Sequence, residues 1–125
     1  MAHVLVVDDE ASIRTMLRSI LERRGHQVSE AENGKDALEK YRDAPADAVI
    51  VDVFMPEQDG VETMIRLRTE YPDVKVVALS GGGWTSKGVA LEHMTDLGAV
   101  ETIAKPFTAE EVVEVVERIL EGRSP

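Results

Sequence analysis

Short apolar runs alternate along the chain with longer segments whose apolar residues recur at helical spacing. Most of these runs are continuous and rich in valine or isoleucine, which is typical of strands buried on both faces. The run at residues 27–31 is more polar, which suits the edge of a sheet. The pattern therefore predicts five strands, at residues 4–7, 27–31, 48–51, 74–79 and 100–104.

Helical periodicity fills the segments between these strands. The first helix is predicted by apolar residues at i, i+3, i+4, i+7 and i+8, which here are Ile13, Met16, Leu17, Ile20 and Leu21. Gly25 ends this helix, and Asn33 can cap the next one. Thr108 and Glu111 have the spacing of a capping box at the start of the last helix. Two further helices are predicted around residues 61–67 and 89–97.

Five βα units in succession indicate one α/β domain spanning residues 1–125, with a parallel sheet covered by helices on both faces. We find no internal linker and no low-complexity run. In a doubly wound sheet of this kind, the functional site lies beyond the carboxyl ends of the strands, where the strand order reverses. The pattern therefore predicts a functional site at the carboxyl ends of the strands.

Composition narrows the function classes. The formal net charge is −10, so we expect no direct contact with nucleic acid, because no basic face could neutralise phosphates. The chain has no cysteine, which excludes disulfides and thiolate metal sites. No apolar stretch approaches the roughly 20 residues that span a bilayer, so we expect no membrane contact. The acidic balance favours a cytoplasmic protein that binds a cation or a basic partner.

Polar residues that could carry chemistry follow four of the predicted strands, and they are Asp8, Asp9, Asp52, Ser80 and Lys105. Three carboxylates at one edge repel each other and call for a compensating charge, which Mg²⁺ with its preference for oxygen ligands would supply. A carboxylate can also attack phosphorus to form an aspartyl phosphate. Mg²⁺ and a lysine ammonium are suited to stabilising such a transfer.

With these residues in place, the sequence resembles a response regulator receiver domain over nearly its whole length. The matching segments are Val-Leu-Val-Val-Asp-Asp-Glu at 4–10, Asp-Val-Phe-Met-Pro at 52–56, Asp59-Gly60, Ala-Leu-Ser-Gly at 78–81 and Ala-Lys-Pro-Phe at 104–107. The resemblance, to chemotaxis-type receivers of two-component systems, implies a flavodoxin-like sheet with strand order 2-1-3-4-5 and five helices.

The resemblance also implies a role for each site residue. Asp52 would accept the phosphoryl group from a partner histidine kinase or histidine phosphotransfer protein. Asp9, Asp52 and the backbone carbonyl of Phe54 would bind Mg²⁺ directly, and Asp8 would act mostly through water. Lys105 would pair with the phosphoryl group, and its bond to Pro106 would be cis. Ser80 would move toward the phosphoryl group and start the switch.

The sequence departs from the family pattern at the second switch position. That position, three residues before Lys105, is normally aromatic and here is Thr102. Two positions that commonly tune the lifetime of the phosphoryl group hold Phe54 and Gly82. Neither side chain can guide an attacking water, so we predict that they do not assist hydrolysis.

These features predict a phosphorylation-activated switch without an output domain, which relays its signal by contact with a downstream protein. The resemblance places that contact on the fourth helix, last strand and fifth helix. Such a switch is not a classical enzyme, although it catalyses its own phosphorylation and dephosphorylation. One alternative is a receiver fragment of a longer response regulator or hybrid kinase.

Two rival classes fit less well. A phosphohydrolase of the haloacid dehalogenase type carries its nucleophile in an Asp-x-Asp motif on the first strand. Here that strand ends in Asp8-Asp9-Glu10, and the chain has no cap domain. A nucleotide-binding module would need a glycine-rich loop after the first strand, where three acidic residues would instead repel phosphates.

Overall fold

The computed structural model describes residues 2–53, 59–80 and 99–122. Its centre is a parallel sheet of five strands in the order β2-β1-β3-β4-β5. The strands are β1 (His3–Val7), β2 (Gln27–Ala31), β3 (Ala48–Asp52), β4 (Val76–Ser80) and β5 (Glu101–Ala104). The predicted flavodoxin-like order is confirmed, and the polar run at residues 27–31 lies at an edge of the sheet as expected.

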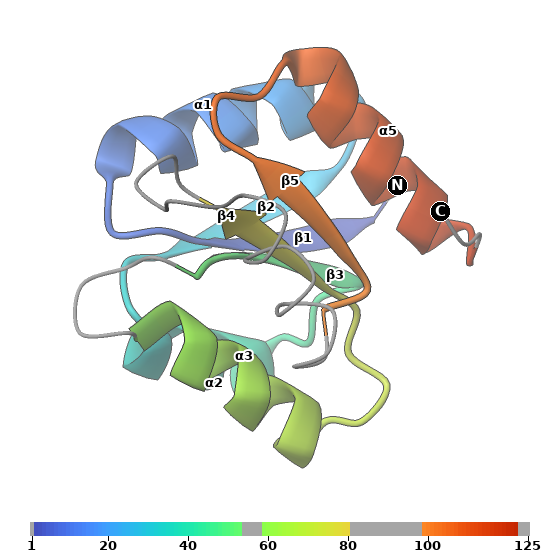
Figure 1. Cartoon of the computed structure of the whole chain (residues 1–125). Coiled ribbons are helices and arrows are strands. Elements are labelled where there is room, and N and C mark those ends of the chain that lie inside the picture. Colours follow the sequence, from blue (N-terminus) through green and yellow to red (C-terminus); the bar gives the residue numbers. More distant parts are fainter. Residues whose placement is uncertain (1, 54–58, 81–98, 123–125) are drawn as a thin grey trace.

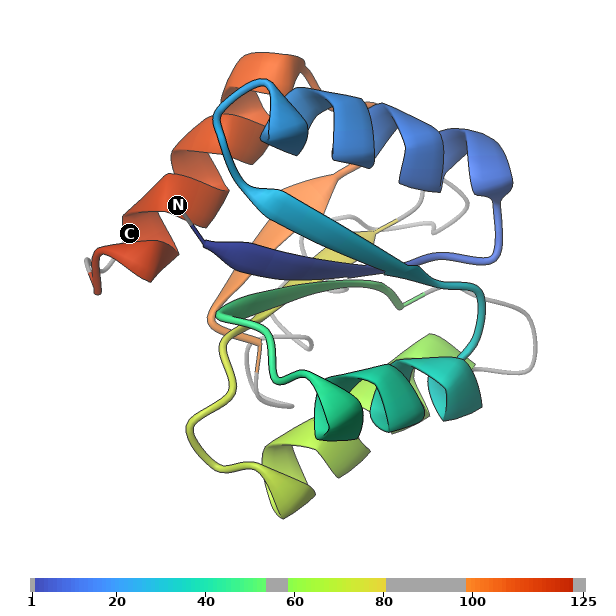
Figure 2. The same ribbon diagram turned by 180° about the vertical axis from the view of Figure 1, so that it is seen from behind.

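Helices cover both faces of this sheet (Figures 1 and 2). On one face lie α1 (Ala11–Glu22) and α5 (Ala109–Leu120). On the opposite face lie α2 (Gly34–Asp43) and α3 (Asp59–Glu70). The helix predicted around residues 89–97 falls outside the described residues. No helix in the described part of the chain is both long and apolar enough to cross a membrane.

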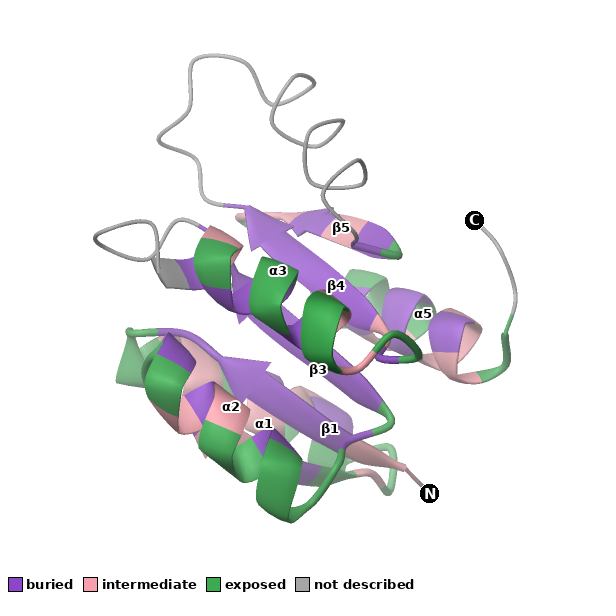
Figure 3. Ribbon diagram, turned by 90° about the horizontal axis from the view of Figure 1, so that it is seen from below, coloured by how far each residue is buried: buried purple, intermediate pink, exposed green. Residues whose placement is uncertain are grey.

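Alternation along the strands divides the core into two layers. Leu5 and Val49 are buried on the side of α2 and α3, whereas Val6 and Ile50 are buried on the side of α1 and α5. Figure 3 shows β3 and β4 buried throughout, between helices with exposed outer surfaces. Because both faces are covered, the polar ends of the strands are the natural place for a site.

Local signals in the sequence set where several helices begin and end. Asn33 caps α2 by accepting a hydrogen bond from the backbone N–H of Asp36 at 2.8 Å. Thr108 and Glu111 form the predicted capping box at the start of α5. Gly25 follows α1 with a φ of 88°, a conformation that side chains with a Cβ rarely adopt.

Two of the predicted helix residues lie outside the core. Met16 is 46% exposed and Ile65 is 40% exposed. Both flank the buried stripe of their helix, and the sheet covers a narrower stripe than the apolar pattern indicated. Within α1, only Leu17 and Leu21 are fully buried. In addition, β4 runs from Val76 to Ser80 rather than from residue 74 to 79.

Candidate functional site

Three of the predicted site residues meet at the carboxyl edge of the sheet. Asp52 is the last residue of β3, Asp8 follows β1, and Lys105 follows β5. The Nζ of Lys105 donates hydrogen bonds to Oδ2 of Asp52 at 3.2 Å and to Oδ2 of Asp8 at 3.3 Å. Both carboxylates are buried, at 3% exposure for Asp52 and 0% for Asp8. One ammonium group thus joins two buried carboxylates from different strands.

Burial and charge shift the pKa values of two members of this group. Burial raises the pKa of Asp8 to about 6, and the nearby charge of Asp52 adds to the increase. The backbone N–H of Glu10 and the ammonium of Lys105 act in the opposite direction. For Lys105, burial alone lowers the pKa, but the two carboxylates outweigh it and raise the pKa above its ordinary value. Lys105 therefore stays charged, and a further cation beside Asp8 would favour the ionised form of that carboxylate.

The turn after β1 gathers three acidic side chains, Asp8, Asp9 and Glu10, which we call the acidic turn. One carboxylate oxygen from each lies within 4.8 Å of the others. The backbone N–H of Glu10 donates to Oδ1 of Asp8 at 2.9 Å and so folds the turn back on itself. Asp9 and Glu10 are exposed. Hard oxygen donors with access to water fit Mg²⁺, which keeps several waters when bound.

Ser80 is the last residue of β4, the neighbour of β3 in the sheet, and it is 2% exposed. Its carbonyl accepts a hydrogen bond from the backbone N–H of Lys105 at 2.8 Å, which ties the end of β4 to the residue after β5. The bond between Lys105 and Pro106 is cis, as the resemblance implied. Ser80 is therefore held at the same edge as Asp52 and Lys105.

The remaining predicted site residues are placed less completely. Thr102 is a half-buried residue in the middle of β5, opposite Ala78 of β4. Phe54 and Gly82 lie outside the described residues, so the roles predicted for them in metal binding and hydrolysis stay predictions.

Gly60 makes a close approach that the sequence pattern did not explain. A Cβ atom at this position would lie 1.9 Å from the backbone carbonyl oxygen of Asp52 and 2.7 Å from the Cα of Val53. Only glycine fits there, because no side-chain atom can share that space with a backbone. The first turn of α3 therefore packs directly on the backbone of Asp52.

Arg14 is a second feature that the sequence analysis missed. Its Nη1 donates to the backbone carbonyl of Asp8 at 2.7 Å, and its Nε donates to Oε1 of Glu30 at 3.1 Å. The signal in the sequence was a cation within the second turn of a helix that follows an acidic strand end. That signal alone does not separate a contact with the turn from an ordinary exposed arginine.

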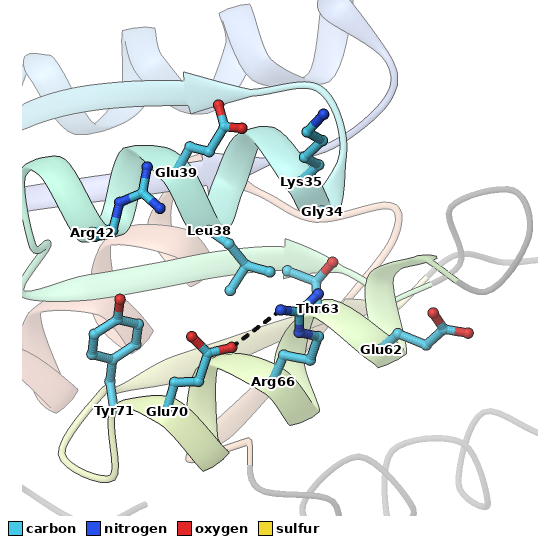
Figure 4. A pocket seen from close by; sticks show the side chains of 10 residues that line it. All are labelled: Gly34, Lys35, Leu38, Glu39, Arg42, Glu62, Thr63, Arg66, Glu70 and Tyr71. Carbon is cyan, nitrogen blue, oxygen red and sulfur yellow. Dashed lines mark hydrogen bonds and ion pairs between the residues drawn. The ribbon is translucent and has the colours of Figure 1, made fainter.

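A separate hollow of about 330 Å³ lies between α2 and α3 (Figure 4). Its charged lining is balanced, with Lys35, Arg42 and Arg66 against Glu39, Glu62 and Glu70. Arg66 also pairs with Glu70 of its own helix at 3.4 Å. This balance gives an ion of either sign little preference for the hollow, and none of the site residues lines it. The carboxyl edge of the sheet remains the candidate site.

Comparisons with known proteins show which family the chain resembles. The family model of the response regulator receiver domain matches residues 4–117. The chemotaxis protein CheY of Listeria monocytogenes is 36% identical over 119 residues, which are 94% of this chain and 98% of that protein. The DNA-binding transcriptional regulator NtrC of Azospirillum brasilense is 34% identical over 99% of this chain, which spans only 25% of NtrC.

Solved structures of receiver domains also resemble this chain. The receiver domain of NtrX from Brucella abortus superposes with a TM-score of 0.87 at 32% identity. The match covers 94% of this chain and 98% of that one. The chain is thus similar both to a protein of its own length and to one part of much longer regulators.

Proposed function

The chain belongs to the response regulator receiver domain family, whose members are signalling switches rather than classical enzymes, and on that premise we propose that Asp52 is its phosphate acceptor. The donor is the phosphohistidine of a partner histidine kinase or histidine phosphotransfer protein. The observation that carries this assignment is the ammonium of Lys105, which contacts Asp52 and Asp8 together.

The residues divide the reaction among them. A carboxylate oxygen of Asp52 attacks the phosphorus, the bond from phosphorus to the partner's imidazole nitrogen breaks, and that nitrogen takes up a proton. Lys105 carries a fixed positive charge beside the oxygen atoms where negative charge develops, and its attachment after β5 holds it there without reorganisation. Ser80, at the end of the neighbouring strand, supplies a hydroxyl for a phosphoryl oxygen.

The excess of acidic groups supports a metal requirement. In the described part of the site, the ammonium of Lys105 pairs with Asp8, Glu10 and Asp52, and the carboxylate of Asp9 lies beside those of Asp8 and Glu10. We assign Asp8, Asp9, Asp52 and the backbone carbonyl of Phe54 to hold Mg²⁺. When bound, the ion neutralises charge on the carboxylates and on the incoming phosphoryl group. Lys105 holds the carboxylates of Asp8 and Asp52 at the strand ends.

Phosphorylation adds roughly −1.5 to −2 charges and biases an equilibrium between two conformations. Ser80 is the residue placed to respond first. Thr102 lacks the aromatic side chain of the family's relay, and the route that we propose for the signal runs through Ser80. The output is contact with a downstream protein. This holds whether the receiver acts alone or within a longer regulator.

A phosphodonor assay tests the assignment directly. The protein is incubated with MgCl₂ and acetyl phosphate, and its intact mass is measured after acid and after alkaline treatment. We expect one phosphoryl adduct that survives acid, is lost in alkali and is absent from Asp52→Asn. Asp43→Asn, an exposed aspartate at the end of α2, is the matched control and should behave as wild type. An adduct that persists in Asp52→Asn, or no adduct in wild type, would overturn the proposal.

A further inference from the structure

Arg14 joins the acidic turn to the edge strand of the sheet. It lies in α1, and its side chain is only 16% exposed. One end of its guanidinium donates to the carbonyl of Asp8 at 2.7 Å, and the other donates to the carboxylate of Glu30 in β2 at 3.1 Å. A planar guanidinium with two partners in different elements is held in one orientation.

The hydrogen bond from Arg14 to Asp8 lies just beyond the end of a strand. The strand β1 ends at Val7, and the N–H of Asp8 still donates to the carbonyl of Ala31 at 3.1 Å. Arg14 provides the donor for the carbonyl of the same residue, as an N–H of a neighbouring strand does within the ladder. A hydrogen bond from a charged donor is among the stronger kinds. The N–H of Asp8 fixes the peptide plane between Val7 and Asp8, and Arg14 fixes the next plane, between Asp8 and Asp9, through its carbonyl.

Asp9 depends on that peptide plane more than its neighbours do. Asp8 is held by Lys105 and by the N–H of Glu10. The carboxylate of Asp9 is exposed, and it has no hydrogen bond or ion pair with any residue that the structure describes. The backbone thus sets the position of the Asp9 Cβ, from which the carboxylate reaches an ion. Arg14 holds the peptide plane before Asp9 through the carbonyl of Asp8, and the Asp8 carboxylate holds the N–H of Glu10 after it.

We propose that Arg14 is a positioning residue for the metal-binding turn, which it braces through the carbonyl of Asp8 while Glu30 orients its guanidinium. This inference rests on the proposed function, because it takes the acidic turn to be the Mg²⁺ site. Arg14 itself touches neither the metal nor the phosphoryl group. Its effect is to hold Asp9 ready, so that little ordering is needed when the ion binds.

Charge and geometry make opposite predictions, which allows a clear test. If Arg14 acted only as a positive charge near the turn, its removal would strengthen Mg²⁺ binding. If it acts by positioning Asp9, its removal weakens binding. Residues that orient metal ligands typically contribute 10- to 100-fold to affinity, so we expect geometry to outweigh the charge of an arginine that Glu30 already neutralises.

Arg18 offers a matched control one turn along α1. Its Nε donates to the other oxygen of Glu30 at 2.6 Å, and its Nη1 donates to Glu22 at 2.9 Å. Its described hydrogen bonds and ion pairs go only to these two glutamates and not to the acidic turn. Arg18→Gln therefore removes the same charge from the same carboxylate but leaves the brace on Asp8 intact.

The experiment is titration of the unphosphorylated protein with MgCl₂ by isothermal calorimetry at constant ionic strength. We expect the Kd of Arg14→Gln to rise about tenfold over wild type. Arg14→Lys keeps the charge but cannot span both partners, and its Kd should fall between the two. Arg18→Gln should bind as wild type or more tightly. In the acetyl phosphate reaction, the Mg²⁺ concentration for half-maximal rate should rise in Arg14→Gln by the same factor.

Each outcome decides something. Wild-type or tighter binding by Arg14→Gln overturns the inference, and so does equal weakening in Arg18→Gln. Urea unfolding checks that each variant is folded. If Arg14→Gln is not, the folded Arg14→Lys decides, and wild-type affinity there overturns the inference. Failure of wild type to bind Mg²⁺ would overturn the metal site and this inference together, whereas normal binding with no effect of Arg14 removes the inference alone.

Discussion

Lys105 places a single ammonium against two buried carboxylates that come from different strands. Its raised pKa keeps it charged across the physiological range, so the ammonium competes with a metal cation for the two carboxylates. Under the proposed function, the same ammonium also supplies positive charge to a phosphoryl group on Asp52. These two roles have opposite consequences for metal binding and for the reaction.

We therefore predict that Lys105→Gln binds Mg²⁺ more tightly than wild type and yet is phosphorylated about a hundredfold more slowly by acetyl phosphate, as when one charge-stabilising donor is removed from an enzyme site. Calorimetry gives the affinity, and the time course of the mass adduct gives the rate. Lys35→Gln, an exposed lysine of α2, should change neither. An unchanged rate in Lys105→Gln would show that the ammonium is not part of the reaction.

Between elements, Glu30 links β2 to α1 through two arginines. Hydrogen bonding from Arg18 is the main cause that lowers the pKa of Glu30, and Arg14 adds to it, while partial burial opposes both. A carboxyl group whose pKa is lower when folded stabilises the protein above its unfolded pKa. That stability is lost as the pH falls through the lowered value.

The prediction is that Glu30→Gln is less stable than wild type at pH 7, by about 1 kcal/mol for partly exposed ion pairs. The difference should shrink once the pH falls below the ordinary value of 4.5 and vanish below the lowered pKa of Glu30. Urea unfolding of both proteins from pH 7 to pH 3 measures it. The exposed Glu39→Gln should track wild type throughout, and a difference for Glu30→Gln that does not depend on pH would contradict the prediction.

The local sequence predicts the elements well where the signal is local. Asn33 and Thr108 start their helices because their hydroxyl or amide groups bond a backbone N–H only three residues away. Met16 and Ile65 lie in predicted helices but are exposed, because their exposure depends on which neighbouring element covers the flank of the helix. No pattern within one helix contains that information.

The distinction between signals within one element and packing between elements also explains what could be predicted of the site. Asp8, Asp52 and Lys105 follow strands, and parallel strands bring their carboxyl ends to one edge, so their meeting follows from topology. The contacts of Arg14 with Asp8 and of Gly60 with Asp52 depend on how closely a helix packs on a turn or strand end. Distances of that kind are set by the packed tertiary structure.

For the whole molecule, a metal that binds the folded state alone should stabilise the fold. The acidic turn and Asp52 belong to different strands, so unfolding disperses the predicted ligands. We predict that Mg²⁺ at a hundred times its Kd raises the free energy of unfolding by about 2.7 kcal/mol. Urea unfolding with and without MgCl₂, with NaCl matching the ionic strength, measures the change.

The control for this prediction is Asp9→Asn, which removes one predicted ligand from an exposed position. Its free energy of unfolding should respond much less to the same MgCl₂ concentration, whereas Asp43→Asn should respond as wild type does. An equal response in Asp9→Asn would mean that the ion stabilises the fold from somewhere other than the acidic turn.

The two hydrogen bonds of Lys105 also bear on when the protein becomes competent during its synthesis. They join residues 97 and 53 positions apart in the chain. A nascent chain that has already exposed Asp8 and Asp52 outside the ribosome still lacks the ammonium, which arrives only with the last strand. Under the proposed function, the unfinished chain carries the acceptor without its charge partner until the last strand has joined the sheet.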